Sequence, residues 1–213
     1  RFGHTPIKST YLIHKANFVA CHNPSYVNKY NMVQELVDGG TFLLNCAWDM
    51  EGLEKHLPGQ VKAFIANHNI KFYTIDGVKI GIETGMGPTR INTILQSAFF
   101  KLTGIIPEDQ AIDLMKAAAK ATYGRKGDDV VQKNWAAIDA GAKQVVEIQV
   151  PESWKNAEDE GLHMTHATEG RQDVIDFVNN IQAKVNAQEG NSLPVSAFKD
   201  YVDGTCLLYT SPS

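Results

Sequence analysis

A glycine-rich stretch followed by polar residues, Gly85 to Thr93 (GMGPTRINT), stands directly before a strongly amphipathic segment. Free backbone N–H groups at a helix start, together with Arg90, Asn92 and Thr93, can bind a phosphate or a carboxylate. The glycines do not follow the GxGxxG order, and no strand pattern precedes them, so the stretch is a poor dinucleotide-binding fingerprint. The alternative is structural, with the glycines ending one element and the polar residues capping the next.

A second candidate follows the apolar run Phe18–Cys21, where His22, Asn23, Pro24 and Ser25 open the next element. Asparagine is a good N-cap and proline is favoured at the first helical position. His22 and Ser25 could therefore contact a phosphate or a ribose at a helix N-terminus. The alternative is simple capping beside a solvated histidine.

Other residues with chemical potential are better explained by structure. Trp48 could stack on a ligand base, but packing into the fold is the stronger hypothesis. His163 and His166 have helical ligand spacing but no third ligand, so we predict no metal site. Tyr123–Lys126 is expected to be a solvated basic turn rather than a phosphate site. The sequence shows no Ser-His-Asp order, no HExxH and no Walker loop, so we predict no catalytic residue.

Composition excludes several classes of protein. The 213 residues carry 20 Lys and Arg against 24 Asp and Glu, a net charge of -4, which argues against a nucleic-acid binder. No run of 18 apolar residues occurs, so no membrane span is predicted. Cys21 and Cys46 each follow an apolar run and are expected to be buried, reduced thiols, as in a cytoplasmic protein.

The first 76 residues alternate between strand and helix patterns. Short apolar runs predict strands, and amphipathic or capped segments predict helices, so we expect a Rossmann-like α/β fold with a parallel sheet and crossover helices. In such sheets ligands bind beyond the carboxyl ends of the strands, here the loops 21–25, 45–49 and 75–77. The expected strands are Phe18–Cys21, Thr41–Cys46 and Lys71–Ile75, and the expected helices are Ser25–Val37 (ended by Asp38-Gly39-Gly40), Met50–Leu57 and Gln60–Asn67.

The rest of the chain is predicted to be a helical stretch and then an extended connector. Apolar spacing predicts helices over Ile91–Leu102, from Pro107 onward, and over Asp128–Ala140. From Pro151 the composition becomes polar and acidic, typical of a linker. One helix is expected over 171–182, and the remainder has too few apolar residues for its own core.

The two ends suggest a partial sequence. The chain starts at Arg1 without an initiator methionine, and Cys206–Ser213 (CLLYTSPS) departs abruptly from the polar segment before it. This octapeptide is similar to a translated sequencing adapter, the alternative being an ordinary short tail. We therefore expect residues 1–205 to be natural and to be cut from a longer protein.

Long blocks of this sequence resemble the pyruvate:ferredoxin (flavodoxin) oxidoreductase family. They include RFGHTPIKSTYLI, FVACHNPSYVNKY, GGTFLLNCAWDMEGLEKHLP, IKFYTIDGVKI, RINTILQSAFFKLTGIIP, TYGRKGDDVVQKNWAAIDAG, VPESWKNAEDE and VNAQEGNSLPVSAF. The resemblance implies that residues 1–150 are the later part of the central gamma domain, whose first part would lie upstream. Residues 151–205 would be the connector to a ferredoxin-like domain, and 206–213 the adapter.

The family resemblance also implies an activity and a set of cofactors. The complete enzyme would convert pyruvate to acetyl-CoA and CO2 on thiamine diphosphate and Mg2+, passing electrons through [4Fe-4S] clusters to ferredoxin or flavodoxin. It would be a cytoplasmic homodimer of anaerobic metabolism, and none of these cofactors would be held by this chain. The alternatives are a related 2-oxoacid oxidoreductase, or a scaffold domain that contacts no ligand.

The region would cover the active site and help to bind coenzyme A, which carries a pyrophosphate and a 3′-phosphate. On this reading Arg90 binds phosphate, Asn92 and Thr93 are neutral donors, and Asn23 and Ser25 are second choices. Two departures from the family pattern stand near these residues. The loop before Arg90 has one extra residue, and Ala47 replaces an expected proline, which frees a backbone N–H.

Overall fold

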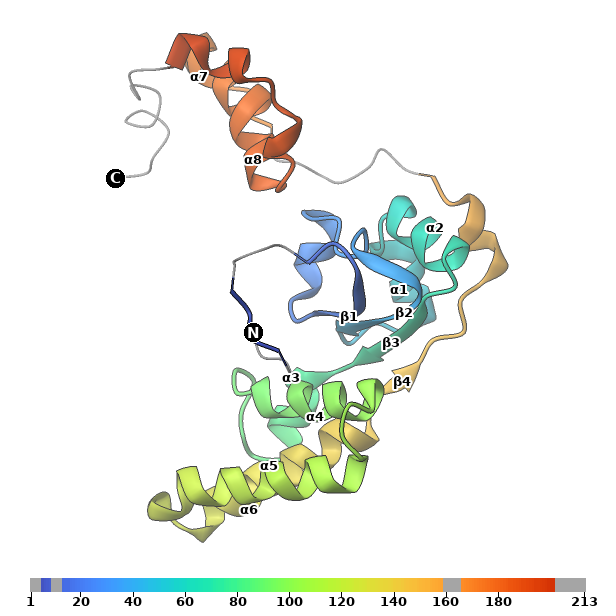
Figure 1. Ribbon diagram of the computed structural model, residues 1–213, viewed down its shortest axis with the longest axis vertical. Helices are drawn as coiled ribbons and strands as arrows, with labels where there is room; N and C mark the ends of the chain where they lie inside the picture. Colours follow the sequence, from blue (N-terminus) through green and yellow to red (C-terminus); the bar gives the residue numbers. More distant parts are fainter. Residues whose placement is uncertain (1–4, 9–12, 159–165, 202–213) are drawn as a thin grey trace.

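The structure, a computed structural model, describes residues 5–8, 13–158 and 166–201. These residues contain a four-stranded sheet, which Figure 1 shows with its helices. The strands are β1 (Ala16–Cys21), β2 (Leu36–Asn45), β3 (Lys71–Ile75) and β4 (Val146–Glu147), in the order β1-β2-β3-β4. The first three pair in parallel, as predicted, and β4 pairs antiparallel with β3. Within the described residues β1 has a strand partner on one side only.

Helices cover both faces of the sheet because alternate strand residues are apolar on both sides. Phe42, Leu44 and Phe72 pack against α1 (Met50–His56) and α2 (Gly59–Asn67). Leu43 and Ile75 face the opposite way and pack with α3 (Gly77–Glu83) and α4 (Asn92–Thr103). The predicted parallel α/β class is therefore confirmed.

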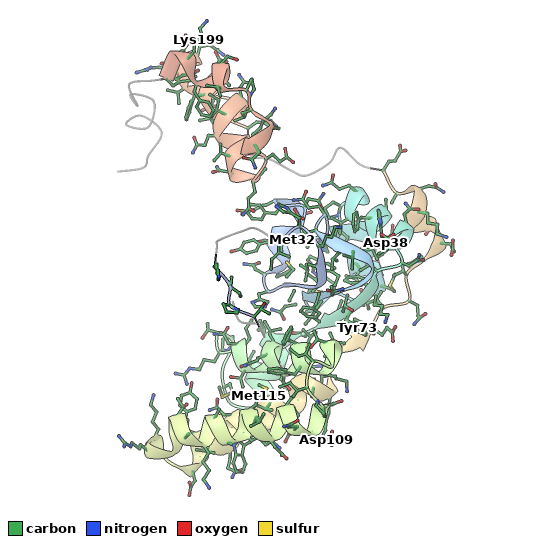
Figure 2. All side chains as sticks on the ribbon, in the orientation of Figure 1. Met32, Asp38, Tyr73, Asp109, Met115 and Lys199 are labelled. Atoms are coloured by element: carbon green, nitrogen blue, oxygen red, sulfur yellow. The ribbon has the colours of Figure 1, made fainter. Side chains whose placement is uncertain are left out.

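Two long helices extend the second layer. Both α5 (Glu108–Tyr123) and α6 (Asp128–Lys143) begin with acidic residues that suit the positive end of a helix. The buried hydroxyl of Ser97 on α4 donates to the Ile138 carbonyl of α6, 2.6 Å away. Figure 1 shows α5 and α6 side by side below α4, and Figure 2 places Met115 within this group of helices.

The helix predicted over Ser25–Val37 is wrong. Only one 3-10 turn forms, Pro24–Asn28, and β2 already starts at Leu36. Valine, tyrosine and asparagine dominate this segment and are poor helix formers, and Val33 is needed in the core.

The Asp38-Gly39-Gly40 segment is likewise no helix end. It lies inside β2, where Gly39 has a φ of 72° and the pairing jumps from Ala16↔Leu36 to Phe18↔Thr41. A Cβ atom on Gly40 would lie 2.8 Å from the Val37 carbonyl oxygen. These glycines therefore allow the irregularity in the pairing of β2 with β1.

The segment after β4 returns to the first helical layer instead of leaving the fold as the predicted linker. A 3-10 turn, Glu152–Asn156, buries Trp154 to 1% exposure against the core that contains Phe72. The indole N–H of Trp154 donates to the Glu54 carboxylate, and Lys62 donates to the other oxygen of that carboxylate. A single tryptophan among polar residues gave no periodic signal, so this part of the linker prediction is wrong.

Residues 166–201 form a small helical unit with its own apolar contacts. The helix predicted over 171–182 is confirmed as α7 (Gln172–Phe177) and a π-helical turn (Val178–Gln182), and it continues as α8 (Ala183–Asn186). Phe177 and Ile181 pack with Leu193 and Tyr201. The predicted adapter, 206–213, and the residues 202–205 before it lie outside the described residues.

In the part of the chain that the structure describes, no helix is long and apolar enough to span a membrane.

Candidate functional site

A groove of about 630 Å³ lies at the carboxyl edge of the parallel sheet. The three loops that the sequence singled out all contribute to it, as the position of ligands in such sheets predicts. Its walls combine apolar side chains with a few polar ones: Pro24, Asn45, Cys46, Ala47, Asp76, Val78, Lys79, Ile82 and Glu83.

Asn45, the last residue of β2, connects the loops around this groove. Its side-chain Nδ2 donates to the His22 carbonyl 2.8 Å away, and its Oδ1 accepts from the Gly77 N–H at 2.9 Å. The residue is only 5% exposed, so both bonds are largely shielded from water. The sequence pattern predicts the loop 45–49 at this edge but gives Asn45 no role of its own.

Three polar side chains in or beside the groove loops act as N-terminal caps. The Asp49 carboxylate accepts from the Gly52 N–H and that of Asp76 from the Lys79 N–H, both at 2.9 Å. Asn23 accepts from the Ser25 N–H at 3.0 Å, which confirms its predicted capping role, although the element it caps is a short 3-10 turn. These contacts fix the loops where α1, α3 and the 3-10 turn begin.

Arg90 stands just before α4, and Asn92 and Thr93 are the first two residues of that helix. Arg90 and Asn92 are exposed and Thr93 is half-buried. Ile91 occupies the cap position without a side-chain cap, so the first N–H groups of α4 receive no capping bond from that side chain. Pro24, which stands between Asn23 and Ser25 in the sequence, lines the groove. Arg90, Asn92 and Thr93 are not among the lining residues.

Close backbone packing holds the Arg90 loop against α3. The N–H groups of Met86 and Gly87 donate to the Gly81 carbonyl at 2.8 and 2.9 Å. A Cβ atom on Gly81 would lie 2.5 Å from the Gly87 oxygen, so only glycine allows this approach. The position of Arg90 therefore depends on α3.

Both described cysteines are buried and free, which confirms the prediction of reduced thiols at strand ends. Burial raises the pKa of Cys21 to about 11. The Cys21 Sγ also donates a hydrogen bond to the Asn23 carbonyl. Burial likewise raises the pKa of Cys46. At neutral pH both thiols are protonated, a state that disfavours nucleophilic attack and metal binding.

The described residues offer no ligand set for a metal or an iron–sulfur cluster. Among residues 5–8, 13–158 and 166–201, no three His, Cys, Asp or Glu side chains gather as they would around a metal ion. His163 lies outside the described residues, so the histidine pair is not placed. Chemistry on such groups is therefore not assigned to these side chains.

The remaining sequence candidates have structural roles. Trp48 is half-buried, packs against the first core and stacks on His56 with ring centroids 4.8 Å apart, which confirms the packing interpretation. In the basic turn, Arg125 and Lys126 are exposed, and the Lys126 ammonium lies 5.6 Å from the centre of the Tyr123 ring.

Comparison with known proteins connects this arrangement to a family. The family model for pyruvate ferredoxin/flavodoxin oxidoreductase matches residues 1–144. The chain belongs to this family. A second model, described as a domain of unknown function, matches residues 164–212.

Relatives in the pyruvate ferredoxin/flavodoxin oxidoreductase family are similar over nearly the whole chain. A pyruvate-flavodoxin oxidoreductase of Enterobacter agglomerans is 45% identical over 205 residues, covering 96% of this chain and 17% of that protein. A pyruvate:ferredoxin oxidoreductase of Moorella thermoacetica is 44% identical over 198 residues, covering 93% and 16%. The chain thus spans about a sixth of the length of these relatives.

The fold has a counterpart among solved structures. A pyruvate oxidoreductase subunit of Thermotoga maritima matches with a TM-score of 0.51 at 18% sequence identity. The match covers 64% of this chain and 67% of that subunit. At this identity the likeness supports the mixed α/β fold alone.

Proposed function

We propose that this chain acts within an enzyme that oxidatively decarboxylates pyruvate to acetyl-CoA and CO2 and passes the electrons to ferredoxin or flavodoxin. The support is membership of the family and the names of relatives that match more than nine-tenths of the chain. Thiamine diphosphate, Mg2+ and [4Fe-4S] clusters would be bound by other parts of a cytoplasmic, homodimeric enzyme.

The proposed contribution of this chain is to bind coenzyme A and cover the active site. The observation that carries it is the exposed Arg90 at the start of α4, a twelve-residue helix whose cap residue, Ile91, makes no side-chain cap bond. A guanidinium beside free N–H groups suits a phosphate, with Asn92 and Thr93 as neutral donors. Asn23 and Ser25, at the end of β1, are the second set of candidate contacts.

The groove itself suits a different part of the same ligand. Pro24, Ala47, Val78 and Ile82 give it apolar walls. The carboxylates of Asp76 and Glu83 outnumber the ammonium of Lys79, so the net negative charge of the groove disfavours phosphate. The neutral pantetheine arm of coenzyme A fits this chemistry better than its phosphates do. The proposal therefore places the phosphates near Arg90 and the arm near α3.

A kinetic experiment on the complete enzyme tests the role of Arg90. We predict that Arg90→Ala raises the KM for coenzyme A by about tenfold, the loss of one charged hydrogen bond to phosphate, with little change in the KM for pyruvate. Arg125→Ala is the matched control, since that arginine is also exposed but lies in the 3-10 turn after α5, Gly124–Lys126. An unchanged KM for coenzyme A would leave Arg90 without this role.

The alternative function is that of a scaffold contacting neighbouring domains and no ligand. It is favoured by exposed apolar side chains on α3, with Val78 42% and Ile82 59% exposed. If this alternative holds, Val78→Ser and Ile82→Ser weaken assembly of the enzyme, and Arg90→Ala leaves its kinetics unchanged.

A further inference from the structure

Asn45 lies between the two sets of candidate contacts for coenzyme A. On one side, its Nδ2 donates to the carbonyl of His22, the residue directly before Asn23. On the other side, its Oδ1 accepts from the N–H of Gly77, the first residue of α3. One buried side chain thus connects the end of β1 with the start of α3.

The start of α3 in turn touches the start of α4. A Cβ atom on Gly77 would lie 3.5 Å from the Cβ of Ile91, the residue between Arg90 and Asn92. The same atom would lie 3.0 Å from Asn45 Oδ1, so Gly77 is packed between Asn45 and Ile91. The chain of contacts therefore runs from His22 through Asn45 and Gly77 to Ile91.

We infer that Asn45 is a positioning residue for coenzyme A binding, which fixes the spacing between Asn23–Ser25 and Arg90–Thr93. The inference rests on the proposed function. A ligand that contacts both sets at once binds well only where the two sets are held at a matching distance. An asparagine fits this role because its amide donates to the His22 carbonyl and accepts from the Gly77 N–H at once.

The test is steady-state kinetics of the complete enzyme carrying Asn45→Ala. The expected result is a KM for coenzyme A raised about tenfold, with kcat and the KM for pyruvate within about twofold of the unsubstituted enzyme. A merely structural role would instead lower the active fraction, which reduces kcat and leaves the KM for coenzyme A unchanged. Hydrogen exchange of the peptide containing Gly77 should become faster in the same variant.

Two further variants complete the design. Gly77→Ala crowds Asn45 Oδ1 without removing it and should raise the KM for coenzyme A in the same direction, so it decides the matter if Asn45→Ala does not fold. Asn67→Ala is the matched control, since it also removes an amide donor, that of an exposed bond to the Lys155 carbonyl, and should leave coenzyme A binding unchanged.

The outcomes separate this inference from the function on which it rests. If Arg90→Ala raises the KM for coenzyme A and Asn45→Ala does not, Asn45 is no positioning residue and the proposed function stands. If neither variant changes this KM, the proposed site fails together with the inference. A loss confined to kcat, or unchanged exchange at Gly77, also overturns the role of Asn45.

Discussion

Gly81 is in contact with the backbone of Gly87 because Gly81 carries no side chain. We predict that Gly81→Ala lowers the free energy of unfolding by about 1–3 kcal/mol, since the new Cβ would lie 2.5 Å from the Gly87 oxygen. Urea unfolding of the chain measures this change. Gly124→Ala is the control, because no atom lies within 4 Å of the added Cβ and the backbone there is helical.

If Gly81→Ala lowers the free energy of unfolding no more than Gly124→Ala does, the loop before Arg90 moves away freely. The close contact would then not determine where Arg90 lies. In that case some element other than α3 would have to hold the proposed phosphate site in position.

Between elements, Glu54 connects α1 and α2 with the turn that carries Trp154. Its pKa is lowered first by the hydrogen bond from the Trp154 indole and then by Lys62. A carboxyl with a lowered pKa stabilises the folded state above its unfolded pKa of about 4.3, and this stabilisation is lost as pH falls through the folded value.

We therefore predict that unfolding stability of the chain falls with pH in this acidic range, and that Glu54→Gln flattens part of the fall. Thermal unfolding at a series of pH values from about 3 to 7 measures it. Glu51→Gln, on the same helix and exposed, should leave the profile unchanged. If both variants keep the full pH dependence, Glu54 does not contribute to it.

The elements that could be predicted from the sequence are those with a regular pattern. Lys71–Ile75 is predicted and found with the same bounds, and the apolar spacing from Ile91 predicts α4 to within one residue at each end. The helix predicted over 25–37 is wrong because Val27 and Val33 are buried in an irregular segment rather than on a helix face. The burial of Trp154 could not be predicted because its packing partners are distant in sequence.

In the candidate site, too, the regular features could be predicted and the long-range contacts could not. The loops at the carboxyl ends of the strands follow from the parallel topology, which the sequence indicated. The buried amide of Asn45 could not be assigned, because its two partners, His22 and Gly77, lie 23 and 32 positions away in the chain. Only the folded structure brings these three loops to one groove.

At the scale of the whole molecule, the central claim is that this chain contacts coenzyme A at the carboxyl edge of its sheet. Family membership covers residues 1–144, and the chain spans about a sixth of its relatives' length. Most of the chemistry is therefore proposed for other parts of the enzyme. What this region contributes depends on where coenzyme A contacts it.

Hydrogen exchange of the complete enzyme with and without coenzyme A answers that question most directly. Backbone N–H groups that bind phosphate exchange more slowly when the ligand is present. We predict slower exchange in two segments, 22–26 and 86–93, when coenzyme A is added. Unchanged exchange in both segments, at a coenzyme A concentration that saturates the enzyme, would contradict the account.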